Sequence, residues 1–348
     1  MKVFSFIGKL FLIILETVLL LCILLYGVMY VLCKGPSTTA RDLFVKSVKE
    51  TSAIGFLADL YLDENEIEEI MNSKESSTTV SSMDTSLITI NEQSESSENG
   101  KADAFGIIDE DGDGIVIEEV HGSTFSGYMM IVYDPSRVIV GCNMQKFGTR
   151  GYTVEEMVQL FGAVAGINGG GFEDFNGQGD GSTPDTLVLF DYQAWGSGTR
   201  NSFVGIDSNG ILHVDCQNTS SIKNANIRWG CCYDQILVSN GEIVVDENKS
   251  SGLNPRTAIG QRSDGAILML VIDGRHVVSL GATYYDEAEI MVQYGAVNAG
   301  NMDGGSSSLM YYNGEYVNNK AAVIGIRRIP TTWLVLPEGV TYEDIKLQ

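Results

Sequence analysis

The segment NPRTAIGQRSDGAILMLVIDGR, residues 254–275, decides the fold. Two strand-forming runs flank the polar turn 263–265, a pattern typical of a β-hairpin. The first run begins at Arg256 and the second ends at Asp273, so we expect both residues at one edge of a sheet. A guanidinium there matches a phosphodiester, because its forked donors meet two phosphate oxygens. Taken alone, Arg256 could instead form a structural salt bridge, and Asp273 could belong to a simple turn.

Further strands surround this hairpin. From about residue 101, glycine turns separate the β-branched runs GIVIEEV, YMMIVYD, RVIVGCN, TLVLF and QILVSNGEIVV. Two helical stretches interrupt them: TVEEMVQLFGAVAG, which Thr153 could cap, and DEAEIMVQYGAVNAG, which Asp286 could cap. The pattern predicts an α+β fold, with a mixed β-sheet core and packed helices, in one domain over residues 101–348.

A glycine-rich segment, GINGGGFEDFNGQGDG, spans residues 166–181. Glycine lets the backbone approach a ligand closely, and carboxylates such as Glu173 and Asp174 can bind sugar hydroxyls or a cation. The alternative is a flexible polar loop.

A second polar segment, AVNAGNMDGGSSSLMYYNGEYVNN, spans residues 296–319. We expect a helix to run into Asn301 and Asp303, and the strand after the serines to fold back through an Asn-Gly turn. A nucleophilic serine is disfavoured, because the sequence has no GxSxG elbow and only three histidines.

Four motifs taken in order, NGGGF, NPRTAIG with VIDGR, NMDGGSSSLMYYNGEYVNN and RRIPTTWLV, resemble those of the phosphodiester glycosidase family. The resemblance extends from about Gly106 to the end of the chain. It implies hydrolysis of a sugar 1-phosphodiester at the anomeric carbon, with a phosphate-linked carbohydrate as substrate. The site residues that it implies are Asn168, Gly169, Arg256, Thr257, Asp273, Gly274, Arg275, Asp303, Gly304, Gly305 and Ser306.

The resemblance and the residue chemistry together suggest roles. Arg256, with Arg275 or Arg328, is expected to hold the phosphodiester. Two carboxylates among Glu173, Asp273 and Asp303 are expected to act at the anomeric carbon. The family's first motif often reads NGGFF followed by Asp, whereas this chain has NGGGFED. The acidic role there therefore falls to Glu173 or Asp174.

The net charge bears on the partners of this protein, and one acidic motif bears on its cofactors. A formal charge of -23 argues against a nucleic acid partner. The motif DEDGDG, residues 109–114, resembles the start of an EF-hand loop, but the twelfth position is Val120 and a strand-like run follows. No cofactor is required by the sequence, although a divalent cation could bind.

The N-terminal region predicts a membrane anchor. Residues 10–32 supply about the 20 apolar residues that a bilayer-spanning helix needs, although Glu16 interrupts them. A cleaved signal peptide and a buried core helix are the alternatives. We expect a cytoplasmic tip and anchor over 1–36, a helical stalk over 37–72 and a disordered Ser-rich linker over 73–100. The enzyme domain would then be extracytoplasmic on a single-pass cell-membrane protein, although the flanking lysines and arginines barely discriminate orientation.

The cysteines and the function leave alternatives open. Cys216 could form a disulfide with Cys231 or Cys232, or these could be buried thiols. The expected function is hydrolysis on a cell-envelope glycopolymer or exopolysaccharide. The alternatives are a non-catalytic glycopolymer-binding protein and a glycosyl-phosphate transferase in exopolysaccharide assembly.

Overall fold

The computed structural model describes residues 2–51, 54–73, 82–90, 102–174, 179–198, 203–214, 218–247, 251–321 and 325–346. The chain divides into two compact units, Met1–Ser73 and Lys74–Gln348.

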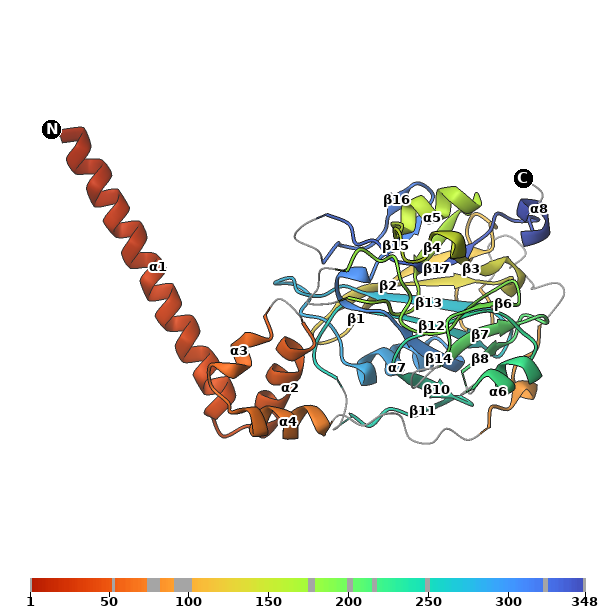
Figure 1. The fold of residues 1–348 in the computed structure, drawn as a ribbon, viewed down its shortest axis with the longest axis horizontal. Coiled ribbons are helices and arrows are strands. Elements are labelled where there is room, and N and C mark those ends of the chain that lie inside the picture. The colour runs from red at the N-terminus through yellow and green to blue at the C-terminus, as the bar shows by residue number, and fades with distance from the viewer. Residues whose placement is uncertain are drawn as a thin grey trace. The chain divides into compact units, whose positions relative to one another are not determined.

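The first unit is helical. Helix α1 is continuous (Figure 1), and its part Phe6–Lys34 is long and apolar enough to cross a membrane. By length and composition it could be a membrane anchor or a signal sequence. The predicted run 10–32 lies inside it. The helices of this unit are α1 (Lys2–Lys34), α2 (Thr38–Lys49), α3 (Phe56–Asp59) and α4 (Glu64–Asn72).

The second unit contains three sheets within the residues that the structure describes, and every pairing between their strands is antiparallel. The seven-stranded sheet has the order β1 (Ile115–His121), β2 (Ser126–Val132), β13 (Ile267–Ile272), β12 (Arg256–Arg262), β14 (Ala296–Met302), β10 (Ile236–Ser239), β11 (Glu242–Ile243). One five-stranded sheet has the order β16 (Glu315–Tyr316), β15 (Met310–Tyr312), β4 (Ala165–Asn168), β17 (Thr331–Val335), β3 (Val138–Cys142). The other has the order β6 (Gln193–Trp195), β5 (Val188–Phe190), β9 (Ile227–Cys232), β7 (Phe203–Asp207), β8 (Leu212–His213).

Short helices accompany these sheets, so the predicted α+β class is confirmed. The described strands pair antiparallel, whereas the prediction was a mixed sheet. Figure 1 shows α5 beside the strands of the β15–β4–β17 sheet and α7 beside β14 and β10. The helices are α5 (Val154–Phe161), α6 (Thr219–Asn224), α7 (Tyr284–Gln293) and α8 (Tyr342–Lys346), with 3-10 turns η1 (Thr85–Leu87), η2 (Pro135–Arg137), η3 (Met144–Lys146) and η6 (Gly305–Ser307).

The position of strand β13 between two cores explains why its sequence is an unbroken apolar run. Its alternate residues face two different layers: Ile267, Met269 and Val271 join the core beneath the two smaller sheets. Leu268, Leu270 and Ile272 join the core that α7 covers. Because both faces are buried, every position of the strand is apolar.

Two expected helices end earlier than predicted, and one begins differently. Thr153 caps α5 as predicted, but Thr283 caps α7, and Asp286, the third residue of that helix, completes the capping box. Gly162 and Gly295 then adopt positive φ angles of 61° and 82° just after the two helices. The apolar residues that follow form strands β4 and β14 where the sequence predicted helix.

Part of the predicted disordered linker is ordered. The Thr89 amide donates to the Ser263 carbonyl at 2.8 Å, and the Asp84 amide donates to Asn240 Oδ1 at 2.8 Å. Ile88 is buried. Residues 82–90 therefore belong to the second unit, which they contact through this side chain and these hydrogen bonds. The remainder of 74–100 lies outside the described residues.

Candidate active site

The three central strands bring the predicted charged residues to one edge of the large sheet. Arg256, the first residue of β12, pairs with Ile272 at the end of β13, and Asp273 follows directly. Thr257 pairs with Met302 at the end of β14, and Asp303 follows it. The prediction that Arg256 and Asp273 lie at one edge is therefore confirmed, and Asp303 joins them.

Asn168, at the end of β4, connects a second sheet to this edge. Its Nδ2 donates to the Asp303 carbonyl at 2.6 Å. Its Oδ1 accepts from Thr257 Oγ1 at 2.8 Å and from the Leu309 amide at 3.2 Å. Asn168 and Thr257 are fully buried. Their contacts suit them to hold the main chain around Asp303.

Gly169 continues this junction. Its carbonyl accepts from the Asp303 amide at 3.0 Å, and its amide donates to the Thr331 carbonyl at 3.0 Å. A Cβ at Gly169 would lie 2.7–2.9 Å from Thr331 atoms, too close for a real contact. Glycine is required here because two strands approach each other.

Arg256 is buried, and its guanidinium is oriented by several contacts. Its Nε donates to the Ala282 carbonyl at 3.0 Å. Its Nη2 donates to Ser251 Oγ and to the Gly252 carbonyl, both at 2.6 Å. The guanidinium carbon lies 4.2 Å from the centre of the Tyr284 ring. These contacts preorganise the charge.

Arg275 lies beside Arg256, with a left-handed φ of 62°. Its Nη2 donates to Asn254 Oδ1 at 3.2 Å, and a Cβ at Gly305 would lie 3.1 Å from the same nitrogen. Although much of the residue is exposed, desolvation of the guanidinium lowers its pKa, as does the charge of Arg256, while Asp303 raises it. Two guanidiniums and one carboxylate therefore share one electrostatic environment.

Glycines make room for this group. A Cβ at Gly274 would lie 2.7–2.9 Å from Pro255, and one at Gly304 would lie 2.9 Å from the Pro255 carbonyl oxygen and 3.9 Å from Arg256 Nη1. Ser306 lies next along η6 and is half-buried. The glycines keep the main chain close to both arginines.

Asp303 is a half-buried carboxylate whose titration is altered. Burial raises its pKa to about 6, opposed by a hydrogen bond from Ser307 and by the charge of Arg327. Asp174 and Asp185 raise the pKa further, so they also lie near it. A carboxylate with this pKa can gain or lose a proton near neutral pH.

Asp273 has both carboxylate oxygens engaged by one neighbouring segment. Oδ1 accepts from Asn318 Nδ2 at 3.0 Å and from the Asn319 amide at 3.1 Å, and Oδ2 accepts from Asn319 Nδ2 at 2.8 Å. This arrangement suits a residue that positions the segment after β16, whereas the sequence suggested a role at the anomeric carbon.

The structure separates two other predicted residues from the group. Arg328 pairs with Glu156 of α5, Nη2 to Oε1 at 2.8 Å, and donates to the Gly151 carbonyl at 2.9 Å. Its neighbour Arg327 is the arginine beside Asp303. Glu173 and Asp174 are both exposed, but Asp174 forms an ion pair with Arg327 at 2.5 Å. Of the two acidic candidates in NGGGFED, Asp174 is the one near Asp303.

The sequence reasoning missed Glu287. This α7 residue is fully buried, and its Oε1 and Oε2 accept from Asn301 Nδ2 at 3.2 and 2.9 Å. Burial raises its pKa to about 8, although Arg256 lowers it. Its sequence context, DEAEI, contains further acids that resemble a solvated face, so no local signal marked it.

Comparison with known proteins identifies the family. Residues 161–336 match the family model of the phosphodiester glycosidases. This chain belongs to the phosphodiester glycosidase family. Its motifs around Asn168, Arg256 and Asp303 all fall within the matched region.

Two curated proteins are similar to this chain over part of their length. Bovine N-acetylglucosamine-1-phosphodiester alpha-N-acetylglucosaminidase is 26% identical over 187 residues, covering 47% of this chain and 33% of that protein. The SPbeta prophage-derived uncharacterized protein YomE of Bacillus subtilis is 39% identical over 88 residues, covering 25% of this chain and 14% of that protein. The chain thus spans a third or less of the curated relatives that it matches.

A solved structure shares the fold. The zebrafish N-acetylglucosamine-1-phosphodiester alpha-N-acetylglucosaminidase catalytic domain, auto-inhibited by its pro-peptide, superposes with a TM-score of 0.52 at 19% identity. The match covers 64% of this chain and 82% of that one. It shows that the second unit has a phosphodiester glycosidase fold.

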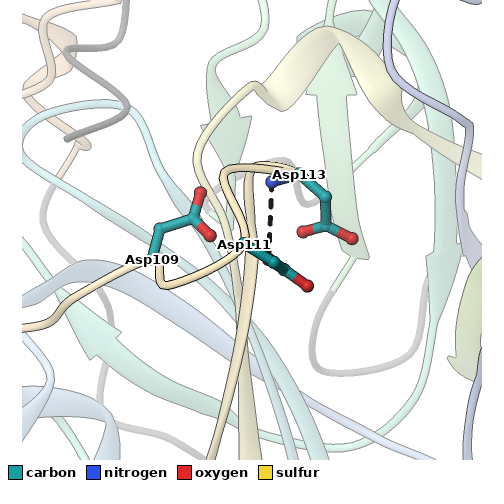
Figure 2. A group of neighbouring side chains, drawn as sticks. All are labelled: Asp109, Asp111 and Asp113. Atoms are coloured by element: carbon teal, nitrogen blue, oxygen red, sulfur yellow. Dashed lines mark hydrogen bonds between the residues drawn. The ribbon is translucent and has the colours of Figure 1, made fainter. Parts of the chain in front are cut away.

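A separate acidic loop of this family member could hold a metal ion. The carboxylate oxygens of Asp109, Asp111 and Asp113 lie within 4.8 Å of one another (Figure 2). Asp109 is buried and accepts from the amides of Gly112 and Gly114 at 2.9 and 3.0 Å. Strand β1 follows the loop, as predicted, and we assign no step of a reaction to it.

The buried cysteines include Cys142 and Cys231, whose pKa values burial raises. Cys231 Sγ lies 3.7 Å from Met302 Sδ, inside the core. Cys231 is therefore a buried thiol in the core, which was one of the two alternatives for this residue. The pairing of Cys216 lies outside the described residues.

Proposed function

We propose that this chain hydrolyses a sugar 1-phosphodiester at the anomeric carbon. The observation that carries the proposal is the pair of guanidiniums, Arg256 and Arg275, at the same sheet edge as Asp303. Arg256 lowers the pKa of Arg275, so the two like charges repel. A phosphodiester anion bound beside them would relieve that repulsion through its negative charge.

The same arrangement supports a route for the reaction. The bond between C1 of the sugar and the phosphate oxygen breaks, and its electron pair leaves with the phosphomonoester. The arginines stabilise the charge on that leaving group, so a general acid has less to do than in ordinary glycoside cleavage. Water supplies the hydroxyl that ends on C1, and its proton passes to a carboxylate. The products are a free sugar and a phosphomonoester.

Asp303 is the carboxylate that we assign to C1. It acts as the base that activates water, which inverts the anomeric configuration, or as the nucleophile, which retains it. The anomer first released, observed by proton NMR, distinguishes these. Asp174, Asp185 and Arg327 all act on the pKa of Asp303. The two aspartates are therefore the candidates for a second carboxylate.

The substrate and location are part of the proposal. Helix α1, if it serves as an anchor, would hold the enzyme domain at the outer side of a membrane, where glycans linked through phosphate are built and displayed. We therefore assign the substrate to the phosphate-linked glycans of the cell envelope.

The test uses the full-length chain in detergent and a synthetic N-acetylglucosamine 1-phosphodiester. We expect release of reducing sugar that Arg256→Ala and Asp303→Asn each reduce at least a hundredfold, as for other preorganised charge-stabilising groups. Arg328→Ala is the matched control, since Arg328 pairs with α5, and it should retain activity. Formation of a new glycoside would identify a transferase, and binding without turnover would identify a glycan-binding protein. Full activity of Arg256→Ala would refute the clamp.

A further inference from the structure

A short hairpin with an apolar tip follows Arg275. The His276 amide donates to the Ser279 carbonyl at 2.9 Å, and the Ser279 amide returns the bond at 3.1 Å. Val277 and Val278 form the tip and are 100% and 88% exposed, and Leu280 is 53% exposed. Contiguous apolar side chains of this kind are unusual on a soluble surface, whereas single ones are common.

The turn itself does not account for the valines. Tight hairpin connections favour glycine, asparagine or aspartate, because those residues tolerate the backbone angles and the solvent. Neither valine has a positive φ, and β-branched residues are poor turn formers. Exposing two valines therefore brings no local structural advantage.

The base of the hairpin is rigid. The Arg275 amide donates to the Leu280 carbonyl at 3.2 Å, and the Leu280 amide donates to the Thr124 carbonyl at 2.8 Å. Ser279 Oγ donates to the Asp273 carbonyl at 2.8 Å and accepts from the Ser126 amide at 3.1 Å. The tip is thus presented at a defined place, and Val277 follows Arg275 by only two residues, about 7 Å of chain at most.

Resting on the proposed function, we propose that this tip (Val277, Val278 and Leu280) is the aglycone subsite, and that the substrate's second phosphate ester carries an apolar, lipid-type group. The charge pattern supports this ligand: two guanidiniums beside exposed valines complement an anionic phosphate joined to a hydrocarbon. Asp303 would face the sugar on the other side of the phosphate. The substrate is then a lipid-linked sugar or glycan 1-phosphodiester, and hydrolysis yields a free sugar and a lipid monophosphate.

The test compares two water-soluble substrates, the n-hexyl and glyceryl diesters of N-acetylglucosamine 1-phosphate, with the full-length chain in detergent. Burial of a few methylenes against the tip predicts a kcat/KM roughly tenfold higher for the hexyl ester. Val277→Ser with Val278→Ser should reduce that preference to about twofold or less. Leu160→Ser, at an apolar position on α5 that is 52% exposed, is the control and should keep the preference. Melting temperatures report whether each variant is folded.

Each outcome decides the proposal. Equal kcat/KM for the two esters in the wild type, or an unchanged preference in the double variant, would overturn the aglycone subsite while leaving the proposed function intact. A valine effect that appears only with substrate embedded in vesicles would show that the tip contacts the bilayer, which also overturns it. No sugar release from either ester would refute the proposed function itself, and the subsite with it.

Discussion

Glu287 provides a quantitative test of how burial acts on the charged residues behind the candidate site. Its side chain is fully buried, and burial raises its pKa from an ordinary 4.5 to about 8, opposed by Arg256 and by the hydrogen bond from Asn301. Asp286 raises it slightly further. The folded state therefore binds this proton more tightly than the unfolded chain does. Glu287 should remain largely protonated at neutral pH, which leaves the charge of Arg256 available for phosphate.

The sign of the stability effect follows from that pKa. The pKa in the folded state is raised, so the contribution of Glu287 to the free energy of unfolding is fully present below about pH 4.5. It is lost as the pH rises towards 8. Each pH unit between the two pKa values corresponds to about 1.4 kcal/mol. The loss in free energy of unfolding therefore reaches up to about 5 kcal/mol at pH 8 and above, which is roughly 10 °C in Tm for a domain of this size.

Glu287→Gln removes the titration while keeping the shape and the hydrogen bond with Asn301. We expect the variant and the wild type to melt at similar temperatures at pH 4.5 and to diverge steadily up to pH 8, with the variant more stable. Differential scanning fluorimetry of the full-length chain at several pH values measures this. Glu289→Gln, at an exposed position of the same helix, is the control and should change stability by no more than about 0.5 kcal/mol. Parallel curves for Glu287→Gln and wild type would refute the reasoning.

Three further predictions concern the site. Because the pKa of Asp303 is raised to about 6 and its ionised form is needed, kcat/KM should rise with pH through about 6, and a profile flat from pH 5 to 8 would contradict this. Arg327→Ala should lower sugar release at least tenfold while Arg328→Ala has little effect, and equal effects in the two variants would remove Arg327 from the site. Gly169→Ala should lower the free energy of unfolding by about 1–3 kcal/mol, measured by Tm, since its Cβ would clash with Thr331, and an unchanged Tm would show that the strands can move apart.

Much of the architecture could be read from local patterns. The β12–β13 hairpin, the capping of α5 by Thr153 and the Asn313-Gly314 turn each depend on a few adjacent residues. Asn313 and Gly314 have φ angles of 46° and 95°, which suit an Asn-Gly connection between short strands. The hairpin's antiparallel pairing then places Arg256 beside Asp273 with no information from elsewhere in the chain.

The stretches GAVAG and GAVNAG were assigned wrongly because their short apolar runs fit a helix end and a buried strand equally well. Only the neighbouring strands, which pair with β4 and β14 on both sides, decide for strand. The burial of all seven β14 residues is likewise supplied by distant segments.

The sequence by itself determined the family, the hairpin and which polar residues end the central strands, because short-range backbone preferences and motif order encode them. Tertiary structure decided that Arg327 rather than Arg328 lies beside Asp303, that Asp174 rather than Glu173 accompanies them, and that Glu287 is buried behind Arg256. In each case two chemically similar residues stand one or two positions apart, and no local rule distinguishes them. Desolvation and Coulomb interactions do so, since both depend on groups that the fold brings together from distant parts of the chain.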